Sequence, residues 1–95
     1  MLEYLKERIV DEVNDALNYM TKAVELKGHD CSCQVFYKAS LNEAEHANWM
    51  TKLFISMEKP ESVSDADYAK MQKEILETYA TSMGKLEALK KLYWQ

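Results

Sequence analysis

Residues 2–30, LEYLKERIVDEVNDALNYMTKAVELKGHD, contain a helical repeat that ends in a turn signal. Apolar residues recur in this stretch at intervals of three and four, at Leu2, Leu5, Ile9, Val13, Ala16, Met20 and Val24. This spacing places them on one face of an α-helix, whereas a half-buried strand would require strict alternation. Gly28 is suited to the left-handed turn that ends such a helix. We therefore predict a helix over about 3–27.

Two further helices follow from the same reasoning. One is predicted over about 31–58, with Asp30 as its N-cap and Pro60 preventing its continuation. The other is predicted over about 65–93, with Ser64 as its N-cap. The stripes predicted to be buried are Val35, Phe36, Ala39, Met50, Leu53, Phe54 and Met57 in the second helix, and Tyr68, Ile75, Tyr79, Leu86, Leu89 and Tyr93 in the third. The expected fold is a single all-α domain over residues 1–95.

The first two helices are expected to form an antiparallel hairpin, because the turn between them is short. At about 1.5 Å per residue, each is roughly 40 Å long. A chain of 95 residues buries only a modest fraction of its surface when it folds alone. We therefore expect a second copy of the hairpin to complete a four-helix bundle, as a homodimer or a larger ring, with the third helix serving assembly.

Charge and composition exclude several classes of function. The chain has 12 Lys and Arg against 16 Asp and Glu, a formal net charge of −4, which argues against nucleic acid or an anionic membrane surface as a partner. With only two Gly, a Gly-rich phosphate-binding loop is excluded. Uncharged stretches fall far short of the roughly 20 residues that span a membrane, and the first residues lack the features of a signal peptide. A cytoplasmic location is expected.

Two polar residues interrupt the apolar arc of the second predicted helix. A helical wheel places Glu43 and His46 among the apolar residues of that arc. Because burying an unpaired carboxylate is costly, Glu43 on this face requires a cation, a proton or a metal. Glu-x-x-His spacing sets the two side chains one turn apart on one face, so a carboxylate oxygen and an imidazole nitrogen can converge on one ion.

The first helix repeats this feature at Glu12, at the edge of its apolar arc. Tyr19 lies two turns further along nearly the same line, and Ala16 lies beside both. When the hairpin is folded at its turn, Glu12 and His46 lie at about the same height. One chain then offers two carboxylates and one imidazole, and two chains related by a two-fold axis offer the complement of a bridged two-metal site.

The pattern of Glu12, Ala16 and Tyr19, followed by Glu43-Ala-Glu-His46-Ala, resembles the first half of the ferritin and rubrerythrin superfamily of di-iron carboxylate proteins. The resemblance covers about residues 3–58. Because this chain has a single hairpin, it is most similar to the encapsulated ferritins, which build a di-iron ferroxidase centre between two subunits. The resemblance implies a ferritin-like bundle, with Glu12, Glu43 and His46 as iron ligands, two irons per dimer, and Tyr19 as a neighbouring catalytic residue.

The activity that this resemblance implies is oxidation of Fe(II) to Fe(III), and with it a role in iron homeostasis. Manganese is the alternative metal, since it accepts the same ligands. An encapsulin shell is the partner that the resemblance suggests, and it would place the protein inside a nanocompartment. The chain departs from that type, because no targeting peptide is seen after Leu92-Tyr-Trp-Gln95.

Other interpretations stay open. A rubrerythrin-like peroxide reductase would use the same ligands with a separate electron donor. In a non-catalytic helical oligomerisation module, Glu43 and His46 would only set the register of a dimer. His29, Cys31 and Cys33 could bind zinc, although three neighbouring positions form a poor tetrahedral set. Glu45 points away from the apolar arc and is expected to be solvated.

Overall fold

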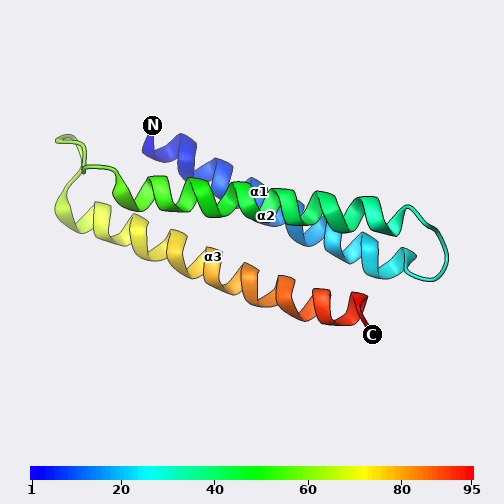
Figure 1. Cartoon of the computed structure of the whole chain (residues 1–95). Coiled ribbons are helices and arrows are strands. Elements are labelled where there is room, and N and C mark those ends of the chain that lie inside the picture. Colours follow the sequence, from blue (N-terminus) through cyan, green and yellow to red (C-terminus); the bar gives the residue numbers. More distant parts are fainter.

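The computed structural model describes the whole chain, residues 1–95, as three α-helices without strands (Figure 1). These are α1 (Leu2–Leu26), α2 (Cys33–Ser56) and α3 (Asp65–Tyr93). The prediction of an all-α chain with three helices is confirmed, and α2 is two residues shorter at each end than expected. The molecule is a rod of 53 × 19 × 15 Å, in which α1 and α2 run antiparallel and α3 lies alongside them.

The turn between α1 and α2 has the left-handed residue expected there. Gly28 has a φ of +80°, a conformation that glycine adopts without a steric penalty. The predicted N-cap of α2 is wrong by two residues, because the cap position is Ser32. The Asp30 carboxylate instead accepts a hydrogen bond of 2.8 Å from the Ser32 backbone N–H, which stabilises the turn before the helix begins. At α3 the predicted cap is confirmed, since Ser64 Oγ accepts a hydrogen bond from the Asp67 backbone N–H.

Large apolar side chains gather at the two ends of the α1–α2 pair. One cluster consists of Leu2, Leu5, Ile9, Phe54 and Ile75, and the other of Met20, Ala23, Cys33, Leu86 and Tyr93. Between them α1 and α2 are lined by small buried residues, Ala16, Ser40 and Ala47. Ser40 Oγ donates a hydrogen bond of 2.6 Å to the Ala16 carbonyl oxygen, so the two helices approach closely at their middle.

The apolar cluster near the N-terminus depends on Phe54, which is fully buried. Replacing Phe54 with Ala should lower the free energy of unfolding by about 3–5 kcal/mol, because it leaves a cavity as well as losing buried apolar surface. Urea denaturation followed by circular dichroism measures this loss. Phe36→Ala, at a half-buried position of the same helix, is the matched control and should cost clearly less. Equal losses in both variants would contradict this description of the core.

Part of the stripe predicted to be buried on α2 is exposed. Val35 and Leu53 are 66% and 51% exposed, contrary to the prediction, and Trp49 on the same side is also exposed. The reason is that the rest of the chain packs against a neighbouring face of α2, the one that carries Cys33, Ser40, Ala47, Thr51 and Phe54. Val35, Trp49 and Leu53 are called the α2 strip below.

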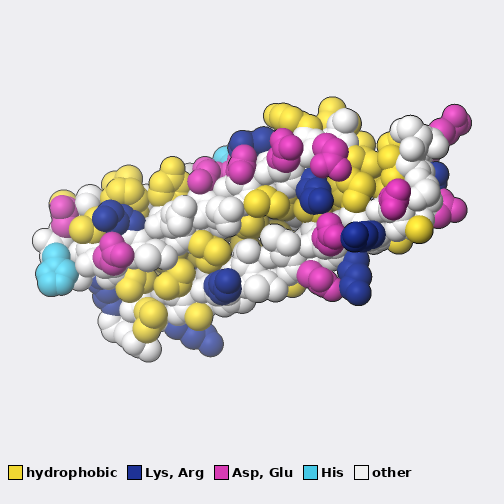
Figure 2. All heavy atoms as spheres, turned by 180° about the vertical axis from the view of Figure 1, so that it is seen from behind, with side chains coloured by type: hydrophobic (Ala, Val, Ile, Leu, Met, Phe, Trp, Pro, Cys, Tyr) yellow, Lys and Arg dark blue, Asp and Glu magenta, His cyan; other side chains and the backbone are white.

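The surface is otherwise rich in charge. On the face shown in Figure 2, acidic side chains follow one another along the rod with exposed hydrophobic side chains beside them. None of the helices has an apolar stretch that would suffice for a membrane crossing.

Candidate metal centre

Glu12 from α1 meets Glu43 and His46 from α2 near the middle of the hairpin. One potential ligand atom of each residue lies within 4.8 Å of those of the other two. Glu12 is buried, and Glu43 and His46 are partly buried. The structure therefore brings together the three residues that the sequence predicts as metal ligands.

The grouping follows from the local packing of the two helices. The hydrogen bond from Ser40 to the Ala16 carbonyl sets the register of α2 against α1. Ala47, next to His46 in the chain, is fully buried, so no bulky side chain separates the helices at that level. Glu43 and His46 are one turn apart on α2, which presents both toward Glu12 across the narrow contact.

The two carboxylate oxygens of Glu12 have different surroundings. Oε1 accepts a short hydrogen bond of 2.6 Å from Arg8. Oε2 is buried and has no hydrogen-bond partner, and His46 Nδ1 lies 3.8 Å from it, too far for a hydrogen bond. A buried carboxylate oxygen without a partner is costly in a native structure. No hydrogen-bond donor of the chain reaches Oε2.

A divalent transition metal is a candidate for the position beside Oε2. An ion bonded at about 2.1 Å to an oxygen and a nitrogen holds the two atoms no more than about 4.2 Å apart. The 3.8 Å between Glu12 Oε2 and His46 Nδ1 lies within this limit. The ligand atoms of all three residues lie within the larger distance of 4.8 Å, so a small side-chain shift would bring all three onto one ion. Two carboxylates and one imidazole form a donor set that suits iron, manganese and zinc. Three ligands from one chain leave further coordination positions open for ligands from elsewhere.

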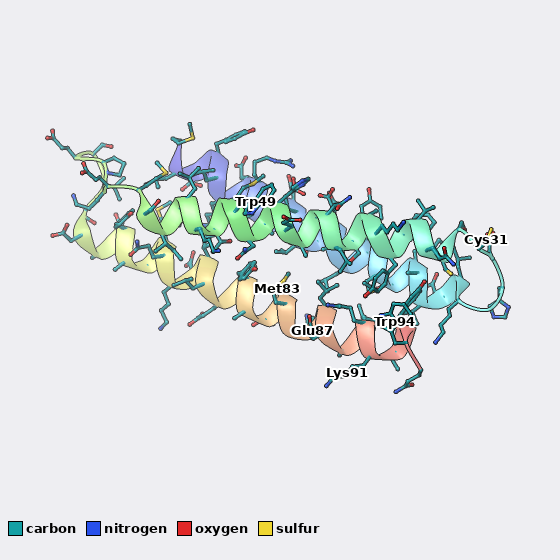
Figure 3. All side chains as sticks on the ribbon, in the orientation of Figure 1. Cys31, Trp49, Met83, Glu87, Lys91 and Trp94 are labelled. Atoms are coloured by element: carbon teal, nitrogen blue, oxygen red, sulfur yellow. The ribbon has the colours of Figure 1, made fainter.

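The centre lies on a side of the hairpin that α3 leaves free. Three polar contacts join α2 to α3 or to the residue just after it. Asn48 accepts from the Tyr79 hydroxyl, Cys33 Sγ lies 3.7 Å from the Tyr93 hydroxyl, and the Tyr37 hydroxyl accepts from Trp94 Nε1. Glu43 and Asn48 are about 140° apart around α2. The His46 side chain is 45% exposed, and its ring lies 5.9 Å from that of Trp49, which Figure 3 labels near the middle of α2. The three candidate ligands thus border the α2 strip.

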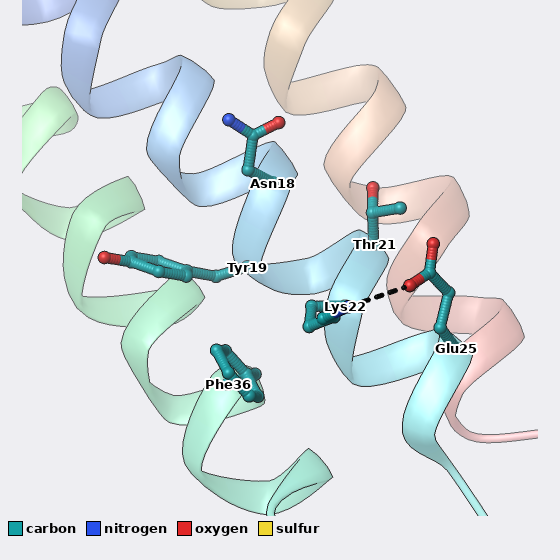
Figure 4. A pocket seen from close by; sticks show the side chains of 6 residues that line it. All are labelled: Asn18, Tyr19, Thr21, Lys22, Glu25 and Phe36. Atoms are coloured by element: carbon teal, nitrogen blue, oxygen red, sulfur yellow. Dashed lines mark ion pairs between the residues drawn. The ribbon is translucent and has the colours of Figure 1, made fainter.

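Tyr19 lies away from the three ligands. It is two turns from Glu12 along α1, roughly 10 Å at 1.5 Å per residue. Its ring lies 6.2 Å from that of Phe36, and both line a shallow hollow beside the ion pair of Lys22 and Glu25 (Figure 4). Figure 4 shows the phenol extending from α1 across α2. A catalytic role for Tyr19 stays a prediction.

The residues of the turn do not gather into a second centre. Cys31 is exposed and points outward (Figure 3), whereas Cys33 is buried. Cys33 Sγ lies 3.7 Å from the Tyr93 hydroxyl, a contact that raises the pKa of Tyr93. The one group of converging ligand atoms in the chain is that of Glu12, Glu43 and His46.

Sequence reasoning did not identify Arg8 and Trp49 as neighbours of this centre. For Arg8 a signal was present, because it precedes Glu12 by four residues, the spacing of helical ion pairs. The hydrogen bond to Glu12 raises the pKa of the Arg8 guanidinium further, so this group stays charged. For Trp49 a signal was also present, because it follows His46 by three residues, a spacing that brings side chains together on one face of a helix.

Comparison with known proteins does not assign the chain to a family: no family model, no curated protein and no solved structure matches it.

Proposed function

We propose that this protein is an iron-binding ferroxidase, which oxidises Fe(II) to Fe(III) at a di-iron site shared between two copies of the chain. The observation that carries the proposal is Glu12 Oε2, a buried carboxylate oxygen that has no partner and faces His46. A cation between these two atoms would satisfy the oxygen. Glu43 would supply the second carboxylate that such an ion needs for charge balance.

The sharing of the site is supported by the surface around it. One chain supplies three ligands, too few for two ions. The ligands border the α2 strip, whose exposed apolar residues gain from being covered. A two-fold axis beside them would set the α2 strip against its own copy and bring the two ligand sets together. The result is the four-carboxylate, two-histidine set of ferritin-like di-iron bundles, the class that the sequence resembles.

The chemistry requires two electrons from two metal ions. Each Fe(II) gives up one electron, so a pair reduces dioxygen, with two protons, to hydrogen peroxide and leaves two Fe(III). Glu12 and Glu43 would favour this direction, because hard, charged oxygen ligands stabilise Fe(III) over Fe(II). In the metal-free chain Arg8 donates to the other oxygen of Glu12, while Oε2 lies on the side of His46.

Anaerobic loading with Fe(II), followed by exposure to air, tests the proposal. We expect about one iron per chain, the ratio that a two-fold-shared pair requires, together with a dimeric or larger mass and ferric absorbance that develops in air. If no iron is retained, Glu43 and His46 are structural and the chain is a helical oligomerisation module. If peroxide oxidises the iron and dioxygen does not, the protein is a peroxide reductase of the rubrerythrin type. A strict monomer that holds iron would contradict the shared site.

A further inference from the structure

Arg8 lies at the edge of the candidate metal centre without offering a ligand atom. One guanidinium nitrogen donates to Glu12 Oε1 at 2.6 Å, and another donates to Asp11 Oδ2 at 3.3 Å. Glu12 is almost fully buried, whereas Asp11 is exposed. The Arg8 guanidinium therefore bridges two carboxylates. That of Glu12 is buried and needs a positive charge beside it, whereas that of Asp11 is already solvated by water.

The metal-free chain needs this contact. Glu12 is a buried carboxylate whose second oxygen has no partner, and a buried charge without an opposite charge strongly opposes folding. Arg8 is the one side chain that donates a hydrogen bond to it. In the absence of metal, Arg8 supplies the positive charge that faces the buried Glu12 carboxylate.

A bound metal would compete with this arrangement. An ion between Glu12 Oε2 and His46 would be attracted by the same negative charge, that of the Glu12 carboxylate, that attracts Arg8. Two cations held on one carboxylate repel each other. Asp11 already contacts the guanidinium, so Arg8 can leave Glu12 by a side-chain rotation and still keep an ion-pair partner. By this movement Arg8 would give up its hydrogen bond of 2.6 Å to Glu12 and keep its contact with Asp11.

We infer that Arg8 is a placeholder for the metal ion: it neutralises Glu12 in the metal-free chain and shifts to Asp11 when a divalent cation binds, and so sets the metal affinity of the centre. This inference rests on the proposed metal site. It predicts effects of opposite sign when Arg8 is removed. The metal-free protein becomes less stable, because Glu12 loses its partner, and metal binds more tightly, because its competitor is gone. If Arg8 served only to orient Glu12, its removal would weaken both.

The experiment compares Arg8→Met and Arg8→Gln with the unmodified chain. Co(II), which air does not oxidise, is titrated by its visible absorbance, and melting is followed by circular dichroism without metal. Arg8→Met should bind Co(II) with a Kd lower on the order of tenfold and should melt at a lower temperature. Arg8→Gln should also bind more tightly but lose less stability, since its amide still donates to Glu12. Lys6→Gln is the control: Lys6 pairs with Glu74 of α3 at 3.4 Å and does not contact the centre, so its Co(II) affinity should change little.

The outcomes separate this inference from the proposed function. Unchanged or weaker Co(II) binding in both Arg8 variants, with binding by the unmodified chain, would overturn the role of Arg8 and leave the metal site standing. If the two Arg8 variants bind Co(II) and the unmodified chain does not, the inference is supported in its strongest form. Absence of binding in all proteins would overturn the metal site, and the inference with it. Tighter binding in Lys6→Gln to the same degree would reduce the effect to net charge and would also overturn the inference.

Discussion

Replacing Glu43 with Gln is expected to abolish metal loading and Fe(II) oxidation while the helices stay intact. The amide has nearly the shape of the carboxylate but no charge, so it neither balances a divalent ion nor stabilises Fe(III). Loss of an outer-shell partner that only orients a metal ligand, and does not compete with the metal for its charge, costs about 10–100-fold in metal affinity. The loss of a carboxylate ligand should therefore exceed about 100-fold, measured as iron bound per chain and as the initial rate of ferric absorbance.

Stability gives a second readout for this variant. Glu43 and Glu12 offer oxygens within 4.8 Å of each other, and like charges at this distance repel. Without metal, Glu43→Gln should thus melt no lower than the unmodified protein. A ligand that opposes folding but is required for metal binding is the signature of a functional residue, because a structural residue would lose stability on replacement.

The matched control for this prediction is Glu45→Gln. Glu45 lies on the same helix two residues later and is exposed, as predicted, so the substitution makes the same change in chemistry and in net charge at a position away from the centre. Metal loading and oxidation should be unchanged. Equal losses in both variants would mean that the acidic surface as a whole, and not the group of Glu12, Glu43 and His46, binds the iron.

Replacing Leu53 with Lys is expected to dissociate the proposed dimer and, with it, to remove the iron. Leu53 belongs to the α2 strip and offers no ligand atom. In a two-fold interface one substitution places two lysines in the same apolar contact, where a desolvated charge without a partner is costly. Sedimentation should report a monomer, and iron retention should fall to that of Glu43→Gln. Because Leu53 itself cannot bind metal, loss of iron in Leu53→Lys would mean that the other chain of the dimer supplies the second half of the site.

Leu92→Lys provides the control for this substitution. Leu92 lies on α3 and is 48% exposed, close to the 51% of Leu53, so the same change is made at the same degree of exposure. We expect this variant to keep its dimeric mass and its iron. If Leu53→Lys remains a dimer with iron bound, the α2 strip is not the interface. If it is a monomer that still oxidises iron, the site is complete in one chain.

The stripe of α1 shows how far local pattern determines burial. Spacing alone predicts that Ile9, Val13 and Met20 face the core, and all three are fully buried. The same reasoning fails at Val35 and Leu53. On α2 the face that packs is shifted around the helix from the predicted arc, toward the small residues Ser40 and Ala47, and helical periodicity cannot tell that small residues will allow a closer approach there. Packing of α1 and α3 decides which face is covered, and it leaves the α2 strip exposed.

By itself the sequence determined the three helices, the turn at Gly28 and the convergence of Glu12, Glu43 and His46. Each of these depends on short-range spacing: the helical period, a residue that tolerates positive φ, and positions equally distant from one turn. Only the tertiary structure decided that Arg8 holds one oxygen of Glu12 while the other has no partner, and that α3 lies away from the ligands. These features depend on which side chains fill the space between helices, because a carboxylate on a helix face is free to point toward either neighbour until packing and burial select one.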